Sequence, residues 1–168
     1  MERIAECHCR QLRAITSGEP ESVYVCHCKA CQRRTGAIIH NGSRWLKSQV
    51  RIEGEHKIYG RMADSGFEIR FHFCPNCGSS VFWEGDRSPT TCGIAVGCFA
   101  DPSFPAPTSS GYEESMHPGW DCLGILRTSR KRALEGRRRE RADTPLTPQL
   151  AWLHRSMSGS CGCQPPPP

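Results

Sequence analysis

The chain of 168 residues lacks two features that would mark a secreted or membrane protein. Its first residues, 1–6, contain no apolar segment of the kind that forms the centre of a secretory signal. No apolar run approaches the ~20 residues that a membrane-spanning helix needs. We therefore expect a cytoplasmic protein with no membrane partner, in which most cysteines stay reduced.

The chain is also short of hydrophobic residues, which make up 37% of it, while glycine and proline together supply 16 and 13 residues. Such a composition favours a modest, loop-rich core. A small core of this kind gains from an additional staple, such as a bound metal.

A net positive charge is missing from most of the chain. Residues 1–126 hold 13 Lys/Arg and 14 Asp/Glu, whereas residues 127–168 hold 9 and 3. The basic character therefore belongs to the C-terminal part, which ends in four prolines and offers little apolar surface. We expect a folded domain over residues 3–126 and a basic, disordered tail over 127–168. Phosphate neutralisation would let the tail bind nucleic acid, but a merely solvated tail explains the same charges.

Helical periodicity is scarce, and short strands separated by turns take its place. Residues 67–73 alternate strictly between apolar and polar side chains, which predicts a strand that leads directly into Cys74. Residues 80–84 and 91–99 read as further strands, and residues 32–36 as one helical turn ended by Gly36. The pattern predicts an all-β fold of short strands.

Cysteine, in contrast, is abundant, with 12 residues in the chain. Seven of them form three closely spaced groups: Cys7-His8-Cys9, Cys26-His27-Cys28-Lys29-Ala30-Cys31 and Cys74-Pro75-Asn76-Cys77. Close spacing lets one turn present several sulfurs to one ion, so these groups predict zinc binding.

The seven cysteines divide naturally into four and three. Cys7, Cys9, Cys74 and Cys77 would form a closed structural zinc site, and Cys26, Cys28 and Cys31 a second zinc site with an open position. This division predicts two zinc ions per chain. The opposite grouping, which pairs residues 28–31 with residues 74–77, is chemically possible, and the sequence alone does not exclude it. A third interpretation is that the cysteines are simply buried thiols.

The remaining candidates for metal ligands are weaker. His8 and His27 lie between cysteines, where a side chain usually points away from the metal. Isolated cysteines are more often small buried hydrophobic residues, and a C-x-C pair in the tail has no fold around it. These residues are Cys92, Cys98 and Cys122 and, in the tail, Cys161 and Cys163.

Three cations, Lys29, Arg33 and Arg34, surround the central cysteine group in sequence. One interpretation is a solvated helix face. The other is an anion-binding rim that also lowers the pKa of nearby thiols. In the second case these three residues bind the substrate.

Two motifs carry a resemblance to a known family. They are Cys26-His27-Cys28-x-x-Cys31-Gln32-Arg33-x-Thr35-Gly36 and Phe73-Cys74-x-x-Cys77-Gly78-Ser79, with a weaker third at Val96-Gly97-Cys98-x-x-Asp101-Pro102. Over roughly residues 3–121 the chain resembles the GFA family, named for the glutathione-dependent formaldehyde-activating enzyme and shared with centromere protein V.

The resemblance implies an Mss4-like fold pinned by zinc and the same division of the cysteines into four and three. It also implies a carbon–sulfur lyase that condenses formaldehyde with glutathione to S-(hydroxymethyl)glutathione. In that case Cys26, Cys28 and Cys31 hold the catalytic zinc. The rival hypothesis is a zinc-stapled binding module without catalysis, associated with nucleic acid or chromatin through its tail.

The chain departs from the family pattern in two places. Glu6 and Arg10 stand where the family usually has glycines beside its first C-x-C pair. After His117-Pro118-Gly119-Trp120 the sequence no longer resembles the family.

Overall fold

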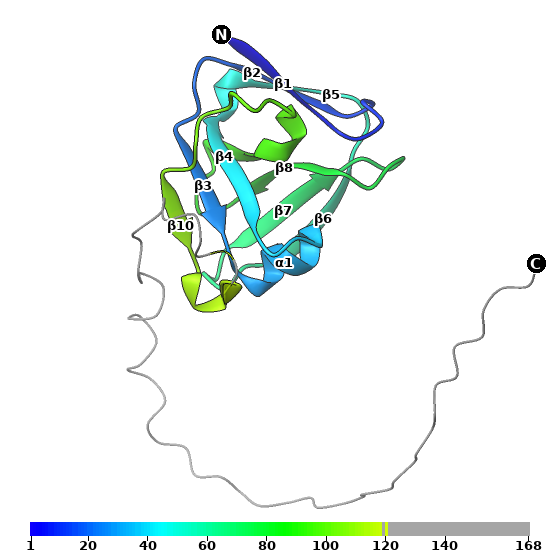
Figure 1. Cartoon of the computed structure of the whole chain (residues 1–168). Coiled ribbons are helices and arrows are strands. Elements are labelled where there is room, and N and C mark those ends of the chain that lie inside the picture. Colours follow the sequence, from blue (N-terminus) through cyan, green and yellow to red (C-terminus); the bar gives the residue numbers. More distant parts are fainter. Residues whose placement is uncertain (119, 121–168) are drawn as a thin grey trace, which may run out of the picture. The chain divides into compact units, whose positions relative to one another are not determined.

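The computed structural model describes residues 1–118 and 120, and these residues form a mostly β protein, as the sequence predicts (Figure 1). The predictions for residues 127–168, and the domain boundary after residue 126, lie outside the described residues. The α-helix of the described part, α1 (Lys29–Thr35), is neither long nor apolar enough to cross a membrane. The Mss4-like arrangement remains a prediction.

The strands form two sheets. The smaller sheet has the order β1-β2-β5 and comprises β1 (Glu2–Glu6), β2 (Arg13–Ser17) and β5 (Val50–Glu53). The larger sheet has the order β10-β3-β4-β9-β8-β7-β6. Its strands are β3 (Ser22–Cys26), β4 (His40–Leu46), β6 (Lys57–Met62), β7 (Glu68–Phe73), β8 (Ser80–Gly85), β9 (Thr91–Ala95) and β10 (Ser109–Gly111). Neighbouring strands are antiparallel, except that β10 runs parallel to β3.

Two local predictions need correction. The strand expected over residues 91–99 ends at Ala95, because residues 96–99 turn into the 3₁₀ helix η2 (Val96–Phe99) and Ala100 adopts a left-handed conformation with φ 49°. The helical turn begins earlier than expected, at Lys29, because the sulfur of Cys28 caps it. It ends as predicted at Gly36, whose φ is 70°.

The core lies where the two sheets face each other. Ala5 and Ala14 from the smaller sheet are fully buried in one cluster with Trp45, Phe82 and Ile94 from the larger sheet. The indole Nε1 of the central Trp45 donates to the hydroxyl of Ser43 at 2.9 Å, and that hydroxyl donates to the carbonyl of Ile94 at 3.1 Å. The core therefore satisfies the polar atom of its largest residue.

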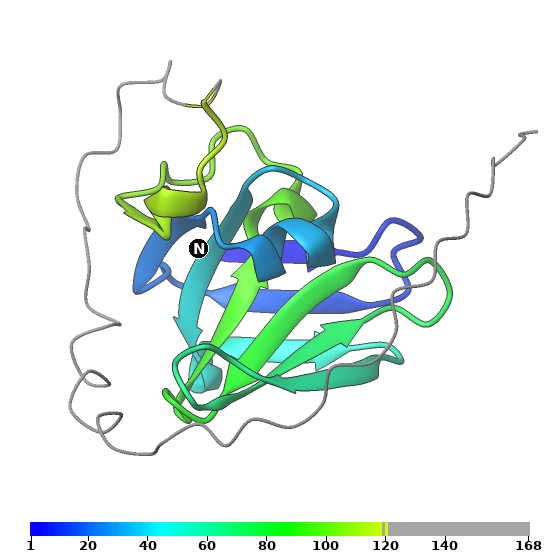
Figure 2. The same ribbon diagram turned by 90° about the horizontal axis from the view of Figure 1, so that it is seen from below.

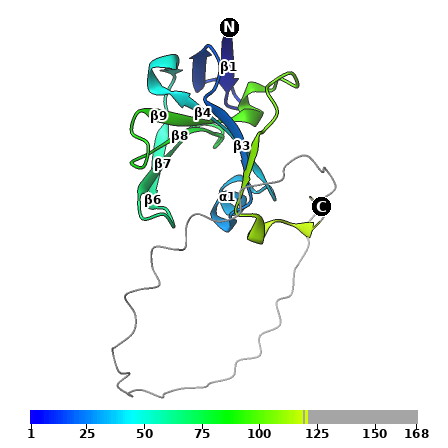
Figure 3. The same cartoon turned by 90° about the vertical axis from the view of Figure 1, so that its left-hand side faces the viewer.

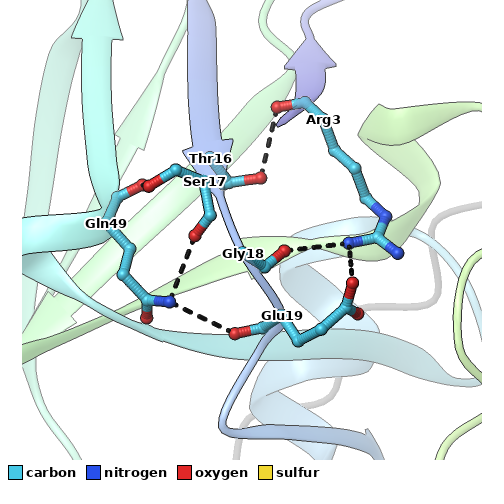
Figure 4. Close-up of polar contacts among 6 residues, drawn as sticks. All are labelled: Arg3, Thr16, Ser17, Gly18, Glu19 and Gln49. Atoms are coloured by element: carbon cyan, nitrogen blue, oxygen red, sulfur yellow. Dashed lines mark hydrogen bonds and ion pairs between the residues drawn. The ribbon is translucent and has the colours of Figure 1, made fainter. Parts of the chain in front are cut away.

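A polar network fixes the connection from β2 to β3 against the short helix η1 (Lys47–Gln49) and β1 (Figure 4). Arg3 donates to the Gly18 carbonyl and to the Glu19 carboxylate, both at 3.1 Å. Gln49 donates to the carbonyls of Ser17 at 3.1 Å and Glu19 at 3.4 Å. These contacts hold the turn that leads into β3, the strand that carries Cys26.

The larger sheet bends, with β6 and β7 on one side, β3 and β10 on the other and α1 on its inner side (Figure 3). Viewed from below, α1 follows the end of β3 and lies beside η3 (Glu113–Ser115) (Figure 2). The side chain of Gln32 joins these parts, because its Nε2 donates to the carbonyls of His27 at 2.7 Å and Ser115 at 3.0 Å. Cys26, Cys28 and Cys31, at the end of β3 and the start of α1, thus lie at the edge of the inner face of the larger sheet.

Candidate metal centres

The first group of converging sulfurs joins segments that lie far apart in the sequence. Cys7 and Cys9 follow β1, whereas Cys74 and Cys77 follow β7, and their four sulfurs lie within 4.8 Å of one another. The Sγ of Cys9 is 3.6 Å from the Sγ atoms of both Cys7 and Cys74. Four thiolates at ~2.3 Å from a tetrahedral zinc are roughly 3.8 Å apart. The observed spacing therefore fits a metal of this kind.

In each half of this group, a left-handed residue follows the second cysteine and closes the turn by a hydrogen bond to the first cysteine, across three residues in one half and four in the other. In the first half, the residue after the second cysteine, Arg10, has φ 64° and its N–H donates to the Cys7 carbonyl at 2.9 Å. In the second half, Gly78 has φ 75° and its N–H donates to the Cys74 carbonyl at 2.9 Å. A left-handed residue is needed at each turn, which gives a reason for glycine there. Arg10 adopts this conformation although it is not a glycine.

Neighbouring polar groups stabilise the thiolates of the first group. The N–H of Leu12 donates to the Cys7 sulfur at 3.2 Å. The Ser79 hydroxyl, 3.4 Å from the sulfur of Cys77, is the main cause that lowers the pKa of that thiol to about 5. The same Ser79 oxygen accepts the N–H of His8 at 3.1 Å and so links the two halves. Such outer contacts orient metal-binding side chains.

Cys26, Cys28 and Cys31 form the second group, and their three sulfurs also lie within 4.8 Å of one another. Cys26 ends β3, Cys28 caps α1, and the N–H of Cys31 donates to the Cys28 sulfur at 3.3 Å. Hydrogen bonds from Cys26 and Cys31 lower the pKa of Cys28 to about 2, while the pKa of Cys26 rises because it is held as the donor. The group therefore carries negative charge that a cation can balance.

The groups of ligand atoms within the described residues match the predicted division into four and three. Neither His8 nor His27 belongs to either group. Cys92 and Cys98 also lie outside both groups, and burial raises the pKa of each to about 11. Cys122, Cys161 and Cys163 are outside the described residues. Zinc as the metal, and its roles at the two sites, remain proposals.

Of the three predicted substrate-binding cations, only Arg34 packs against the sheet. Lys29 and Arg33 are exposed on α1. The Arg34 guanidinium lies 4.6 Å from the ring centre of Phe71 and 5.6 Å from that of Trp83, and its Nη1 donates to the Ser80 hydroxyl at 3.1 Å. Its Nε and Nη2 are buried and find no hydrogen-bond partner among the described residues. An anion at this place would satisfy them.

His40 is a residue near the second group that the sequence did not indicate. It pairs with Cys26 across β3 and β4, is 5% exposed, and its Nε2 has no partner within the described part of the chain. Burial and then the charge of Arg34 lower its pKa to about 3, so the ring is neutral at pH 7. Only the register of two strands brings it to the cysteines, and no local motif marks it.

Taken together, the fold and the two thiol clusters define a small β protein with a four-sulfur and a three-sulfur candidate metal centre. A family model described as glutathione-dependent formaldehyde-activating enzyme matches residues 2–115. The chain therefore belongs to this family, as its motifs predict.

A crystal structure of a Rhodobacter sphaeroides protein is similar at 20% identity, covering 59% of this chain and 91% of that one with a TM-score of 0.45. A search of curated proteins returns no match.

Proposed function

We propose that the chain is a zinc-dependent carbon–sulfur lyase that condenses formaldehyde with glutathione. The observation that carries this proposal is that, among the described residues, three sulfurs and not four converge at Cys26, Cys28 and Cys31. Near them lies Arg34, whose Nε and Nη2 find no partner in the same part of the chain. A zinc ion held by these sulfurs would supply a Lewis-acidic position at which a thiol loses its proton. The other group would hold a structural zinc.

The residues around the second group would position the reactants. Three thiolates and one divalent ion leave a charge of −1, which opposes a fourth thiolate. Arg34 offsets this charge from a half-buried place, where screening is weaker than at the surface. Lys29 and Arg33 would attract the carboxylates of glutathione from the exposed side of α1. The net reaction is an addition, in which a sulfur–carbon bond forms, the carbonyl oxygen gains a proton and nothing leaves.

The neutral ring of His40 adds a group that can exchange a proton with the new hydroxyl. Its Nε2 is buried and has no hydrogen-bond partner among the residues that the structure describes, and His40 lies across the strand pair from Cys26. The need for reduced thiols favours a reducing compartment, and we propose the cytoplasm as the location.

Calorimetry of the zinc-loaded full chain with glutathione tests this proposal. We expect binding that weakens as salt is added, because charge contributes to it. The Arg34→Met variant keeps an apolar stem over Phe71 and should weaken binding by roughly 1.5–3 kcal/mol, the usual contribution of a hydrogen bond to a charged group. Arg33→Ala should cost less, since Arg33 is exposed. The control Arg51→Ala, on β5, should bind as the wild type does.

Failure of the zinc-loaded wild type to bind glutathione would contradict the proposal and favour the rival binding module. If the zinc-loaded protein binds glutathione but does not accelerate adduct formation from formaldehyde above the uncatalysed rate, the thiol-binding site is supported and the lyase activity is contradicted.

A further inference from the structure

The inner face of the larger sheet carries Cys26. Further along the same face lies a pocket. Alternate residues of a strand share a face, and directly paired residues of neighbouring strands do too. Cys26 and Tyr24 therefore lie on one face of β3. Tyr24 pairs with Gly42, Arg44 pairs with Gly93, and Gly93 pairs with Trp83, which extends this face across four strands.

Glycines make room for the pocket. A Cβ on Gly93 would lie 2.0 Å from Cε2 of Trp83, so the indole rests directly on the β9 backbone. A Cβ on Gly42 would lie 3.0 Å from the ring of Tyr24 and 3.1 Å from Trp83. The two aromatic rings thus lie flat against the sheet. Beside them is a cavity of about 130 Å³, lined among others by Tyr24, Arg44, Trp83 and Arg87.

The pocket is positively charged. The Arg44 guanidinium lies 5.9 Å from the ring centre of Tyr24. Neither Arg44 nor Arg87 forms an ion pair with any of the described residues. Burial raises the pKa of Tyr24 to about 12, so its hydroxyl keeps its proton and can donate it to an anion. The two arginines and the phenol are donors suited to a carboxylate.

The distance of the pocket from Cys26 matches the distance between the sulfur and the carboxylate end of a peptide-like thiol. Tyr24 is two residues from Cys26, or ~7 Å along the strand. Arg44 pairs with Ser22, two residues beyond Tyr24, but its guanidinium reaches back to 5.9 Å from the Tyr24 ring centre. A carboxylate at the end of the residue that follows a cysteine lies ~7 Å from that cysteine in an extended chain. The cavity is also much smaller than the ~300–1,000 Å³ of sites that enclose a whole ligand. It therefore has room for an acidic end.

We propose that this pocket, with Arg44 and Arg87 as its anion-binding residues, binds the carboxylate end of a peptide thiol whose sulfur reaches Cys26, Cys28 and Cys31. The inference rests on the proposed function and adds how the substrate is chosen: acidic peptide thiols are preferred over neutral ones. Arg34 balances charge at the sulfur end, and Arg44 and Arg87 bind the far end.

Three probes separate the two ends of the site in calorimetry on the zinc-loaded full chain. Glutathione has both a thiol and carboxylates, 2-mercaptoethanol has only the thiol, and S-methylglutathione has only the carboxylates. The variants are Arg44→Ala, Arg87→Ala and the double substitution, with Arg51→Ala on β5 as the matched control. All of these side chains are exposed, so the variants should fold.

The double variant should bind glutathione about 10-fold or more weakly, since it loses charge-assisted hydrogen bonds, and should bind 2-mercaptoethanol as the wild type does. S-methylglutathione should bind weakly to the wild type and not measurably to the double variant. Unchanged glutathione affinity in the double variant overturns the pocket while leaving the thiol site intact. If glutathione and S-methylglutathione bind with equal, arginine-dependent affinity and 2-mercaptoethanol does not bind, the pocket is supported and the proposed function is contradicted instead.

Discussion

The Cys7→Ser variant is expected to lose its cooperative fold. Cys7 is buried in the core cluster, and its sulfur belongs to the group that joins the start of the chain to Cys74, 65 residues beyond Cys9. A structural zinc supplies on the order of 10 kcal/mol of folding free energy. That is comparable with the whole stability of a small domain, ~5–15 kcal/mol. Circular dichroism and zinc analysis of the purified variant measure both consequences.

The matched control is Cys92→Ser. Cys92 is also buried in the core cluster but lies outside both sulfur groups. Burying a hydroxyl there should lower stability by about 1–3 kcal/mol and leave the fold and the zinc content unchanged. A Cys7→Ser protein with wild-type melting temperature and zinc content would show that the first group is not a structural metal site.

The Cys31→Ser variant should remain folded and lose one zinc together with thiol binding. Helix α1, which carries Cys31, contributes no buried residue to the core. A site of two thiolates holds zinc much less firmly than one of three. We expect glutathione affinity to fall by about 100-fold or more, because the metal position itself is lost. Elemental analysis, circular dichroism and calorimetry on the same sample check the three parts.

Cys98→Ser serves as its control, since Cys98 is half-buried like Cys31 but belongs to neither group. It should keep its zinc and its glutathione affinity. Equal loss of structure in the Cys31→Ser and Cys7→Ser variants would mean that the assignment of one structural and one open site is wrong.

The cysteine groups could be predicted from the sequence because their information is local. Two or three thiols within a few residues require a tight turn, and backbone hydrogen bonds to the carbonyls of Cys7 and Cys74 close such turns in the structure. The alternation from Phe67 to Phe73 likewise predicts β7. The fold alone brings Cys7 and Cys9 together with Cys74 and Cys77. For this pairing of groups the sequence left two alternatives open.

The inner face of the sheet could not be predicted in the same way. Arg44, Trp83 and Gly93 meet only because β4, β8 and β9 pair in a particular register, and residues far apart in sequence carry no sign of it. Arg33 and Arg34 look equivalent in the sequence. The structure separates them, since Arg33 is exposed and Arg34 lies over Phe71.

X-ray absorption at the zinc edge tests the central claim most directly, because it counts the sulfurs around each metal. For the full chain loaded with two zinc ions, one closed and one open site predict about 3.5 sulfurs per zinc, the mean of four and three. Adding glutathione should raise this mean to about 4, and the Cys31→Ser variant should show no rise. A mean of four sulfurs before glutathione is added, or no change on adding it, would contradict the claim that the second site is open to a thiol.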